Sequence, residues 1–219
     1  MEHHKPRLYK TMTEIATLEI QDAILNGIFK PGSKIVPAQL EKNFNLGRAA
    51  IRDAIRELSG KGLLINLPNK GTVVAGPISK EEIIEVFEIR FLLEGKAAFR
   101  AAQTISPEGI HELEVINDTL KEVPRSDSKE FFAINKQFHL SLYKHSKWSF
   151  LCKTIDQLWD QTQIFRIVYP FEAEAIGVYI DDHKKILSAL INNNPEKVRD
   201  ELVSHVKKGF VNIMQRHTP

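Results

Sequence analysis

The strand-forming residues of this chain are confined to one short stretch, and that feature constrains the fold more than any other. In Gly62–Ala75, apolar β-forming residues flank the turn residues Pro68–Gly71, which predicts two strands joined by a turn. From Ser79 onward, helical periodicity continues to the end of the chain without a further strand signal. The predicted fold class is therefore mostly α.

Three helices are predicted before the hairpin. The first covers about Met12–Asn26 and is closed by Gly27, and a shorter second helix covers about Pro37–Asn43. The third follows the turn at Asn45–Gly47 and ends near Gly60. The order of helix, short helix, turn, helix and hairpin predicts a winged helix-turn-helix domain.

The third helix has two faces with different chemistry. Its core face is an apolar stripe of Ile51, Ile55 and Leu58. Its other face carries arginines at four-residue spacing: Arg48, Arg52 and Arg56. A helix in the major groove reads bases with its N-terminal residues, and the arginine fork reaches O6 and N7 of guanine together.

This geometry assigns different expected roles to the three arginines on double-stranded DNA. We expect Arg48 to read a base, Arg52 to contact a base edge or a phosphate, and Arg56 to pack or bind the backbone. Gln39 in the preceding helix is a further candidate. The alternative is a solvated face in which Arg56 pairs with Asp53 or Glu57.

Charge is distributed unevenly along the 219 residues. Residues 1–77 contain 11 Lys/Arg and 7 Asp/Glu, a balance of +4, whereas residues 78–219 contain 19 and 21, a balance of −2. A basic first third agrees with a small DNA-binding domain joined to a neutral-to-acidic body.

Six helices are predicted after the hairpin, and the domain boundary is placed in Val74–Ser79, giving domains 1–77 and 78–219. The helices are expected at about Ser79–Gln103, from Ser106, and at about Ser128–His145, Ser149–Val168, Phe171–Ile191 and Pro195–Arg216. The expected architecture is an all-helical bundle carried behind the winged helix-turn-helix.

Three histidines of this body are predicted to face its interior. His139 follows Asn135 by one helical turn on an apolar face, while His183 and His205 lie within the apolar stripes of two other helices. Burying three unpaired imidazoles is costly, so they should share partners or a metal ion.

Composition excludes several other classes of protein. The single cysteine, Cys152, rules out an internal disulfide framework and an all-cysteine metal site. No apolar run approaches the roughly 18–20 residues needed to cross a bilayer, and the N-terminus lacks the apolar core of a signal peptide. A cytoplasmic protein without a membrane partner is expected.

The sequence resembles a known family over nearly its whole length. "AILNGIFKPGSKI", "LEKNFNLGRAAIRDAIRELSGKGLL" and "PNKGTVVA" are similar to the DNA-binding head of GntR-family bacterial transcription factors. "EIRFLLEGKAA", "NKQFHLSLYKHS" and "DDHKKILSAL" resemble the ligand-binding FCD domain of the FadR-type branch, in its six-helix form.

The resemblance implies further DNA contacts and also two departures. Lys70 and Gly71 match the wing tip that contacts the minor groove or the backbone in the family. The family usually has Ser or Thr in place of Gly47, and Thr-Pro in place of Ala49 and Ala50, so Ala49 is counted among the DNA-binding residues and a different operator preference is expected.

For the body, the resemblance implies a metal site and an effector site. The matching positions form a site of three histidines with, usually, an aspartate in place of Asn135, so Asn135, His139, His183 and His205 are the expected ligands. Zn²⁺ is the expected ion, with Ni²⁺ or another transition metal as the alternative.

The resemblance places an arginine in the effector cavity at Arg90, where it would clamp a carboxylate, although Glu94 four residues on offers an ordinary helix pair. Arg166 and Tyr169 are additional effector candidates. A small organic acid, a homodimer and a palindromic operator follow from the family, in which repression relieved by a metabolite is the common pattern.

Two other functions were weighed against a ligand-responsive regulator. A metal-dependent enzyme acting on small carboxylates would use the three histidines, but the sequence shows no evident carboxylate base beside them, no nucleophile motif and no need for a basic head. A DNA-binding architectural protein with a purely structural metal is the second alternative. We expect no enzymatic activity.

Overall fold

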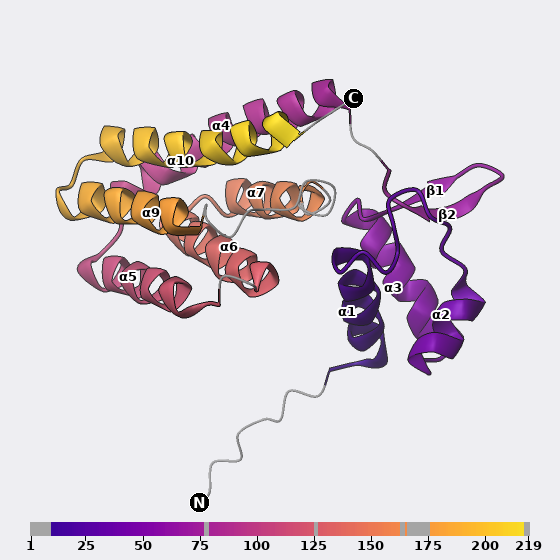
Figure 1. Ribbon diagram of the computed structural model, residues 1–219. Helices are drawn as coiled ribbons and strands as arrows, with labels where there is room; N and C mark the ends of the chain where they lie inside the picture. The colour runs from indigo at the N-terminus through magenta and orange to yellow at the C-terminus, as the bar shows by residue number, and fades with distance from the viewer. Residues whose placement is uncertain (1–9, 77–78, 125–126, 163–164, 166–175, 217–219) are drawn as a thin grey trace, which may run out of the picture. The chain divides into compact units, whose positions relative to one another are not determined.

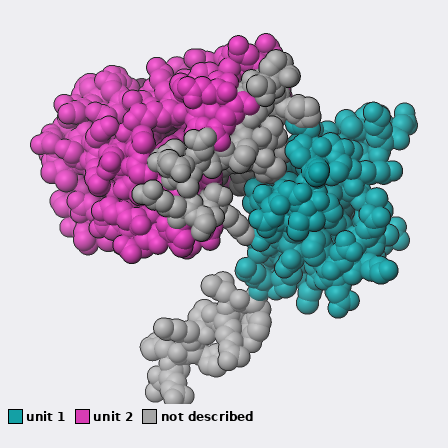
Figure 2. Space-filling model, viewed as in Figure 1, with its two compact units in different colours: residues 1–77, 166–168 teal, residues 78–165, 169–219 magenta. Residues whose placement is uncertain are grey.

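The computed structural model describes residues 10–76, 79–124, 127–162, 165 and 176–216. The chain divides into two compact units, which meet in sequence at Pro77 and Ile78 (Figure 2). Each unit has its own buried core and is described separately.

The first unit begins with three helices, α1 (Met12–Leu25), α2 (Pro37–Phe44) and α3 (Arg48–Gly60). Helix α1 starts with a capping box in which Thr11 and Glu14 bond each other's backbone N–H groups, a signal that the sequence analysis did not use. Helix α2 ends at Asn45, which adopts a left-handed conformation with φ of 52° and turns the chain toward α3.

The core of the first unit lies between α1 and α3. Ile20 and Ile24 of α1 and Ile51 and Leu58 of α3 are each fully buried, with relative exposures of 0 %. Full burial of such a side chain contributes about 1.5–3 kcal/mol, so the apolar stripe fixes how α3 rotates about its axis. The opposite face of α3 is consequently exposed.

Strands β1 (Leu64–Leu67) and β2 (Gly71–Val74) form the predicted wing. They pair antiparallel, with Leu64 opposite Val74 and Leu67 opposite Gly71. Gly71 has a φ of 79°, a conformation that favours glycine at the end of the turn. The winged helix-turn-helix expected from the sequence is confirmed.

The second unit is entirely helical in the part that the structure describes (Figure 1). Its helices are α4 (Lys80–Ala102), α5 (Pro107–Glu122), α6 (Ser128–Lys144), α7 (Ser149–Gln161), α9 (Ile176–Ile191) and α10 (Pro195–Arg216). Among the described residues, no helix combines the length and the apolar character required to span a membrane.

Helices α4 and α10 run side by side along the second unit (Figure 1). Their close approach depends on Gly95, because a Cβ atom there would lie 2.9 Å from Cγ2 of Val203. The main core beneath them includes Phe138, Leu142 and Trp159. The histidine-bearing helices α6, α9 and α10 all contribute to this core.

The observed bounds of α7 and α9 can be compared with their predicted ranges. The helix expected over Ser149–Val168 ends at Gln161 instead, where Thr162 forms the C-cap and its hydroxyl donates to the carbonyl of Trp159. Residues 163–164 and 166–168 of the predicted range lie outside the described residues. Helix α9 begins at Ile176, and residues 171–175 of its predicted range lie outside the described residues.

Candidate functional site

The exposed face of α3 displays the three arginines predicted to contact DNA. Arg48 is exposed at the first position of the helix, and the side chains of Arg52 and Arg56 are 71 % and 77 % exposed. Both Arg52 and Arg56 approach a carboxylate oxygen of Asp53 at 3.7 Å, which is a weak, solvent-screened ion pair. The row of guanidinium groups remains accessible from outside the domain.

The N-terminus of α3 lacks a side-chain cap. Gly47 occupies the N-cap position, and no side chain at that position bonds the first N–H groups of the helix. Ala49, beside Arg48, is exposed, so this end of α3 presents backbone donors and one guanidinium group rather than the usual hydroxyl.

The other predicted DNA-binding residues are exposed as well. Gln39 lies on the outer face of α2, and Lys70 and Gly71 lie at the tip of the wing. Together with the arginines of α3, they are presented by three parts of the same compact unit: α2, α3 and the wing.

The three histidines come together in the core of the second unit. One ring nitrogen from each of His139, His183 and His205 lies within 4.8 Å of the others. The Nε2 atoms of His139 and His205 are 3.1 Å apart, and all three residues are at most 3 % exposed. The rings thus converge from α6, α9 and α10 on one point, and we call them the histidine cluster.

The histidine cluster fits a transition-metal ion. Within the described part of the chain, Nε2 of His183 and Oδ1 of Asn135 are buried and have no hydrogen-bond partner. An unbonded buried polar atom costs about 1–3 kcal/mol, a cost that coordination would remove. Three neutral imidazoles are a donor set suited to Zn²⁺ and neighbouring ions, and Asn135 lies one helical turn before His139.

Each histidine also has a polar residue beside its outward-facing nitrogen Nδ1. Nδ1 of His139 lies 2.9 Å from the hydroxyl of Tyr143, which donates to Glu94 at 2.6 Å. Nδ1 of His183 lies 3.2 Å from Oδ1 of Asn117. A metal-binding histidine is commonly held in this way, with its second nitrogen bonded to an outer partner.

The third histidine faces a carboxylate. Nδ1 of His205 lies 3.6 Å from Oδ2 of Asp182, whose carboxylate accepts hydrogen bonds from Lys208 at 2.6 and 2.7 Å and from Lys185 at 2.9 Å. Two carboxylates, Asp182 and Glu94, lie near the cluster, which the sequence did not indicate. Both lie on the outer side of the rings, and cationic side chains already engage them.

Burial determines the protonation of these groups. It lowers the pKa of His183 well below its usual value and lowers that of His205 to about 4, so both rings are neutral at pH 7. Burial also lowers the pKa of His139, against the opposing influence of Glu94. For Glu94 itself, burial favours a raised pKa, but the Arg90 guanidinium, the nearby His139 ring and the hydrogen bond from Tyr143 outweigh it and hold the pKa at about 2.

Arg90, the predicted effector clamp, is paired with Glu94. Its Nε donates to Oε1 of Glu94 at 2.6 Å, and its guanidinium lies 4.7 Å from the ring centre of Trp159 and 5.0 Å from that of Phe87. This is the helix pair that the sequence offered as the alternative. The other two effector candidates, Arg166 and Tyr169, lie outside the described residues.

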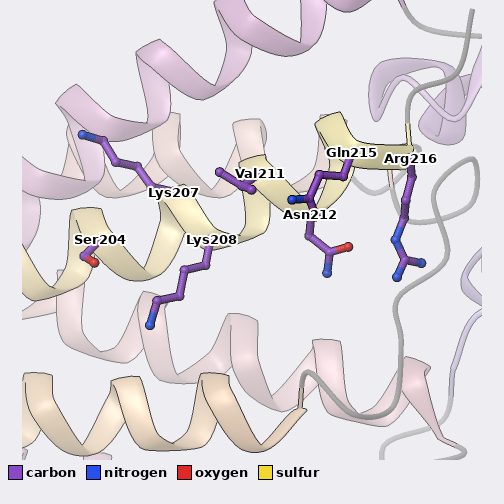
Figure 3. Close-up of a pocket in the computed structure, with 7 residues that line it drawn as sticks. All are labelled: Ser204, Lys207, Lys208, Val211, Asn212, Gln215 and Arg216. Atoms are coloured by element: carbon purple, nitrogen blue, oxygen red, sulfur yellow. The ribbon is translucent and has the colours of Figure 1, made fainter.

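Two surface pockets border the outer partners of the histidine cluster. One, of about 600 Å³, follows the C-terminal half of α10, where Lys208, Asn212 and Arg216 point to one side and Lys207 to the other (Figure 3). Its Lys208 binds Asp182 and so connects this pocket with His205. The second, of about 410 Å³, lies between α5 and α9 and includes Asn117.

The sequence analysis missed four residues around the cluster: Glu94 as an indirect partner of His139, Tyr143, Asn117 and Asp182. Tyr143 could have been found, because it follows His139 by four residues and shares its helix face. Asp182 is adjacent to His183 in sequence, but its carboxylate lies beside Nδ1 of His205, because successive helix residues point in different directions. Asn117 has no sequence signal, since its helix meets α9 only in the folded chain.

Comparison with protein families identifies both parts of the chain. Residues 13–74 match the model described as bacterial regulatory proteins, gntR family. Residues 85–208, more than half of the chain, match the FCD domain. The first match contains α3 and the wing, and the second contains all three histidines.

Similar proteins match this chain over most of their own length. The HTH-type transcriptional regulator McbR of Escherichia coli is 22 % identical over 92 % of this chain and 94 % of its own. The HTH-type transcriptional repressor RspR of Escherichia coli is 23 % identical, over 88 % and 84 %. The Nta operon transcriptional regulator of Aminobacter aminovorans is 24 % identical, over 85 % and 87 %.

Solved structures show the same fold. Escherichia coli McbR/YncC superposes with a TM-score of 0.79 at 21 % identity, covering 96 % of this chain and 100 % of that one. Lar of Listeria monocytogenes has a TM-score of 0.65 at 17 % identity, covering 95 % and 99 %.

Proposed function

Because this chain belongs to the gntR family of bacterial regulatory proteins and carries an FCD domain, it is a transcriptional regulator, and we propose that it is a metabolite-responsive repressor. In this proposal it binds a palindromic operator as a homodimer and releases it when a small organic acid binds near a metal ion. The observation that carries the proposal is one chain with an exposed arginine row on α3 and a buried histidine cluster in a separate unit.

The proposed DNA contact rests on the chemistry of α3. Arg48 stands at the N-terminal end of the helix, the end that reads bases in helix-turn-helix proteins, and its guanidinium can bond guanine bidentately. Arg52 and Arg56 follow on the same exposed face, where phosphate contacts strengthen binding without adding sequence preference. Lys70 and Gly71 would place the wing against the neighbouring groove or backbone.

The proposed dimer is supported by an exposed apolar strip in the second unit. Ile89 and Leu92 of α4 are 38 % and 72 % exposed, and Trp148 and Phe150 at the start of α7 are 42 % and 83 % exposed. Lys96, one turn beyond Leu92, lies 5.9 Å from the ring centre of Trp148, so α4 and the start of α7 are neighbours on this surface. Two such strips on a symmetric dimer would cover each other.

The proposed effector site includes the histidine cluster and its metal, with Zn²⁺ as the expected ion. A bound divalent ion would offer open coordination positions to an effector carboxylate. Without an aspartate among the ligands, Asn135 contributes an amide oxygen and no charge, which leaves the bound ion more electropositive and favours an anionic effector. RspR, a relative of this chain, is named as a repressor, which supports the proposed direction of regulation.

The effector acts on DNA only through its different affinity for the two states of the regulator. Coupling of about 1–3 kcal/mol, the range typical of allosteric proteins, would change operator affinity about 5- to 150-fold. An enzyme built on the cluster is the competing function, and turnover of small organic acids by the zinc-loaded protein would revive it. Stoichiometric binding without product is the outcome that we expect.

The direct test is selection of DNA by the full-length zinc-loaded protein from a random duplex library at physiological salt. We expect a palindromic sequence to be enriched, and a panel of small di- and tricarboxylic acids to contain one that lowers its affinity. Failure to enrich any palindrome over bulk DNA would refute the regulator proposal. Palindrome binding that no acid or metal alters would instead support an architectural protein with a structural metal.

The dimer is tested by placing a charge on the apolar strip. Phe150→Asp should shift the sedimentation coefficient from dimer to monomer and weaken binding to the palindrome more than to one half-site. Ile191→Asp is the matched control, because Ile191 is also exposed, at 57 %, but lies at the end of α9. Equal dimerisation of both variants would place the interface elsewhere.

A further inference from the structure

A continuous series of buried polar contacts connects α4 to the histidine cluster. Arg90 donates to Glu94 at 2.6 Å, the hydroxyl of Tyr143 lies 2.6 Å from the other oxygen of Glu94, and Nδ1 of His139 lies 2.9 Å from that hydroxyl. Glu94 and Tyr143 are both 0 % exposed. A charged side chain is rarely buried this deeply unless it is paired with a partner of opposite charge or with hydrogen-bond donors.

The directions of these hydrogen bonds can be assigned from chemistry. The carboxylate of Glu94 is ionised and only accepts, so the single proton of the Tyr143 hydroxyl points to Glu94. The tyrosine oxygen can then only accept from His139. Oε2 of Glu94, 3.6 Å from Nδ1 of His139, is likewise an acceptor. Both polar atoms facing Nδ1 therefore call for a proton on that nitrogen.

We propose that Tyr143 is a positioning residue that keeps the proton of His139 on Nδ1 and thereby leaves its Nε2 lone pair directed into the histidine cluster. The inference rests on the proposed metal site and deepens it. Imidazole binds a metal through an unprotonated nitrogen, so a ring held in the opposite tautomer would first have to move its proton. The nitrogen left free to bind the metal is Nε2 of His139, which lies 3.1 Å from Nε2 of His205.

In this arrangement Arg90 neutralises Glu94 rather than recognising an effector. The guanidinium balances the one carboxylate that anchors Tyr143, and Trp159 and Phe87 enclose it. Asp182, beside His205, is likewise paired with cations, Lys208 and Lys185.

The test is the full-length Tyr143→Phe protein, which keeps the ring and loses one oxygen atom. We expect zinc affinity, measured by competition with a chromogenic chelator, to fall about 10- to 100-fold, the usual effect of removing an outer partner of a metal ligand. In the chelator-treated protein, ¹⁵N spectra of the histidine rings should show His139 protonated on Nδ1 in the wild type and partly on Nε2 in the variant.

Ser141→Ala is the matched control, because it removes another buried hydroxyl from α6, and it should change neither measurement. Glu94→Gln is a second variant that retains the side-chain shape, and it should also weaken zinc binding. Wild-type zinc affinity and an unchanged His139 tautomer in Tyr143→Phe would overturn the role of Tyr143. Absence of zinc binding by the wild type would instead overturn the proposed metal site, which separates the two failures.

Discussion

Helix α3 and the histidine cluster are built on opposite principles. The arginines of α3 stand in solvent, with Arg52 and Arg56 more than 70 % exposed, and they contact only Asp53 at 3.7 Å among the ion pairs described for them. His183 is 0 % exposed, and each histidine of the cluster has an outer residue beside its Nδ1. Exposed charges act separately on an external partner, whereas buried polar groups act only as a set.

The largest predicted effect is on metal binding, and it follows from removing one residue of the histidine cluster. His183→Ala removes the ring whose Nε2 is buried without a partner, and we expect the purified protein to lose its stoichiometric metal. Metal analysis by mass spectrometry measures this. His111→Ala is the control, because His111 is exposed on α5, and retention of metal in His183→Ala would show that the ligand set is wrong.

Removing a single exposed arginine should weaken operator binding substantially. Arg48→Ala is expected to cost about 1–3 kcal/mol of operator binding and to relax selectivity at one base pair in each half-site. Fluorescence anisotropy with operator and random duplexes measures both quantities. Arg199→Ala in α10 is the control. An equal loss on both duplexes would make Arg48 a phosphate contact instead of a base-reading residue.

A negative charge added beside the histidine cluster should change both its metal affinity and the stability of the metal-free protein. Asn135→Asp supplies an anionic ligand, so metal affinity is expected to rise on the order of tenfold. The metal-free variant should lose about 1–3 kcal/mol of stability, because its buried carboxylate has no cation to pair with. Titration calorimetry and denaturant unfolding test these effects.

Gln137→Glu provides the comparison for that variant, since it also adds a carboxylate to α6 but at an exposed position. It should leave both quantities unchanged. If Asn135→Asp behaves in the same way, Asn135 does not face the metal.

The smallest expected effect lies at the uncapped start of α3. Gly47→Ser should stabilise the first turn by a few tenths of a kcal/mol, since a serine hydroxyl can accept from a free N–H group and Gly47 has no heavy atom near its Cβ position. Slower amide hydrogen exchange at Ala49 and Ala50 would reveal it. Gly60→Ser, at the other end of the helix, should not slow exchange there, and equal slowing by both substitutions would contradict a capping effect.

Much of the first unit was predictable because its information is local. The apolar stripe of Ile51, Ile55 and Leu58 fixes which face of α3 is buried, and the arginines then have to be outside. The hairpin could be located from its turn residues, and the end of α2 from Asn45 and Gly47. The predicted end of α7 at Val168 was wrong, because the helix ends at Gln161 with Thr162 as its C-cap, and apolar periodicity alone does not mark where a helix ends.

By itself, the sequence determined the mostly helical fold, the winged helix-turn-helix and the inward direction of three histidines, because helical and strand periodicities decide which side chains are buried. Only the tertiary structure decided that the three rings converge within 4.8 Å, and that Asn117 and Asp182 stand beside the outer nitrogens of His183 and His205. Those contacts join residues from helices far apart in the chain, such as His183 and Asn117, and only the packing of α5 against α9 brings that pair together.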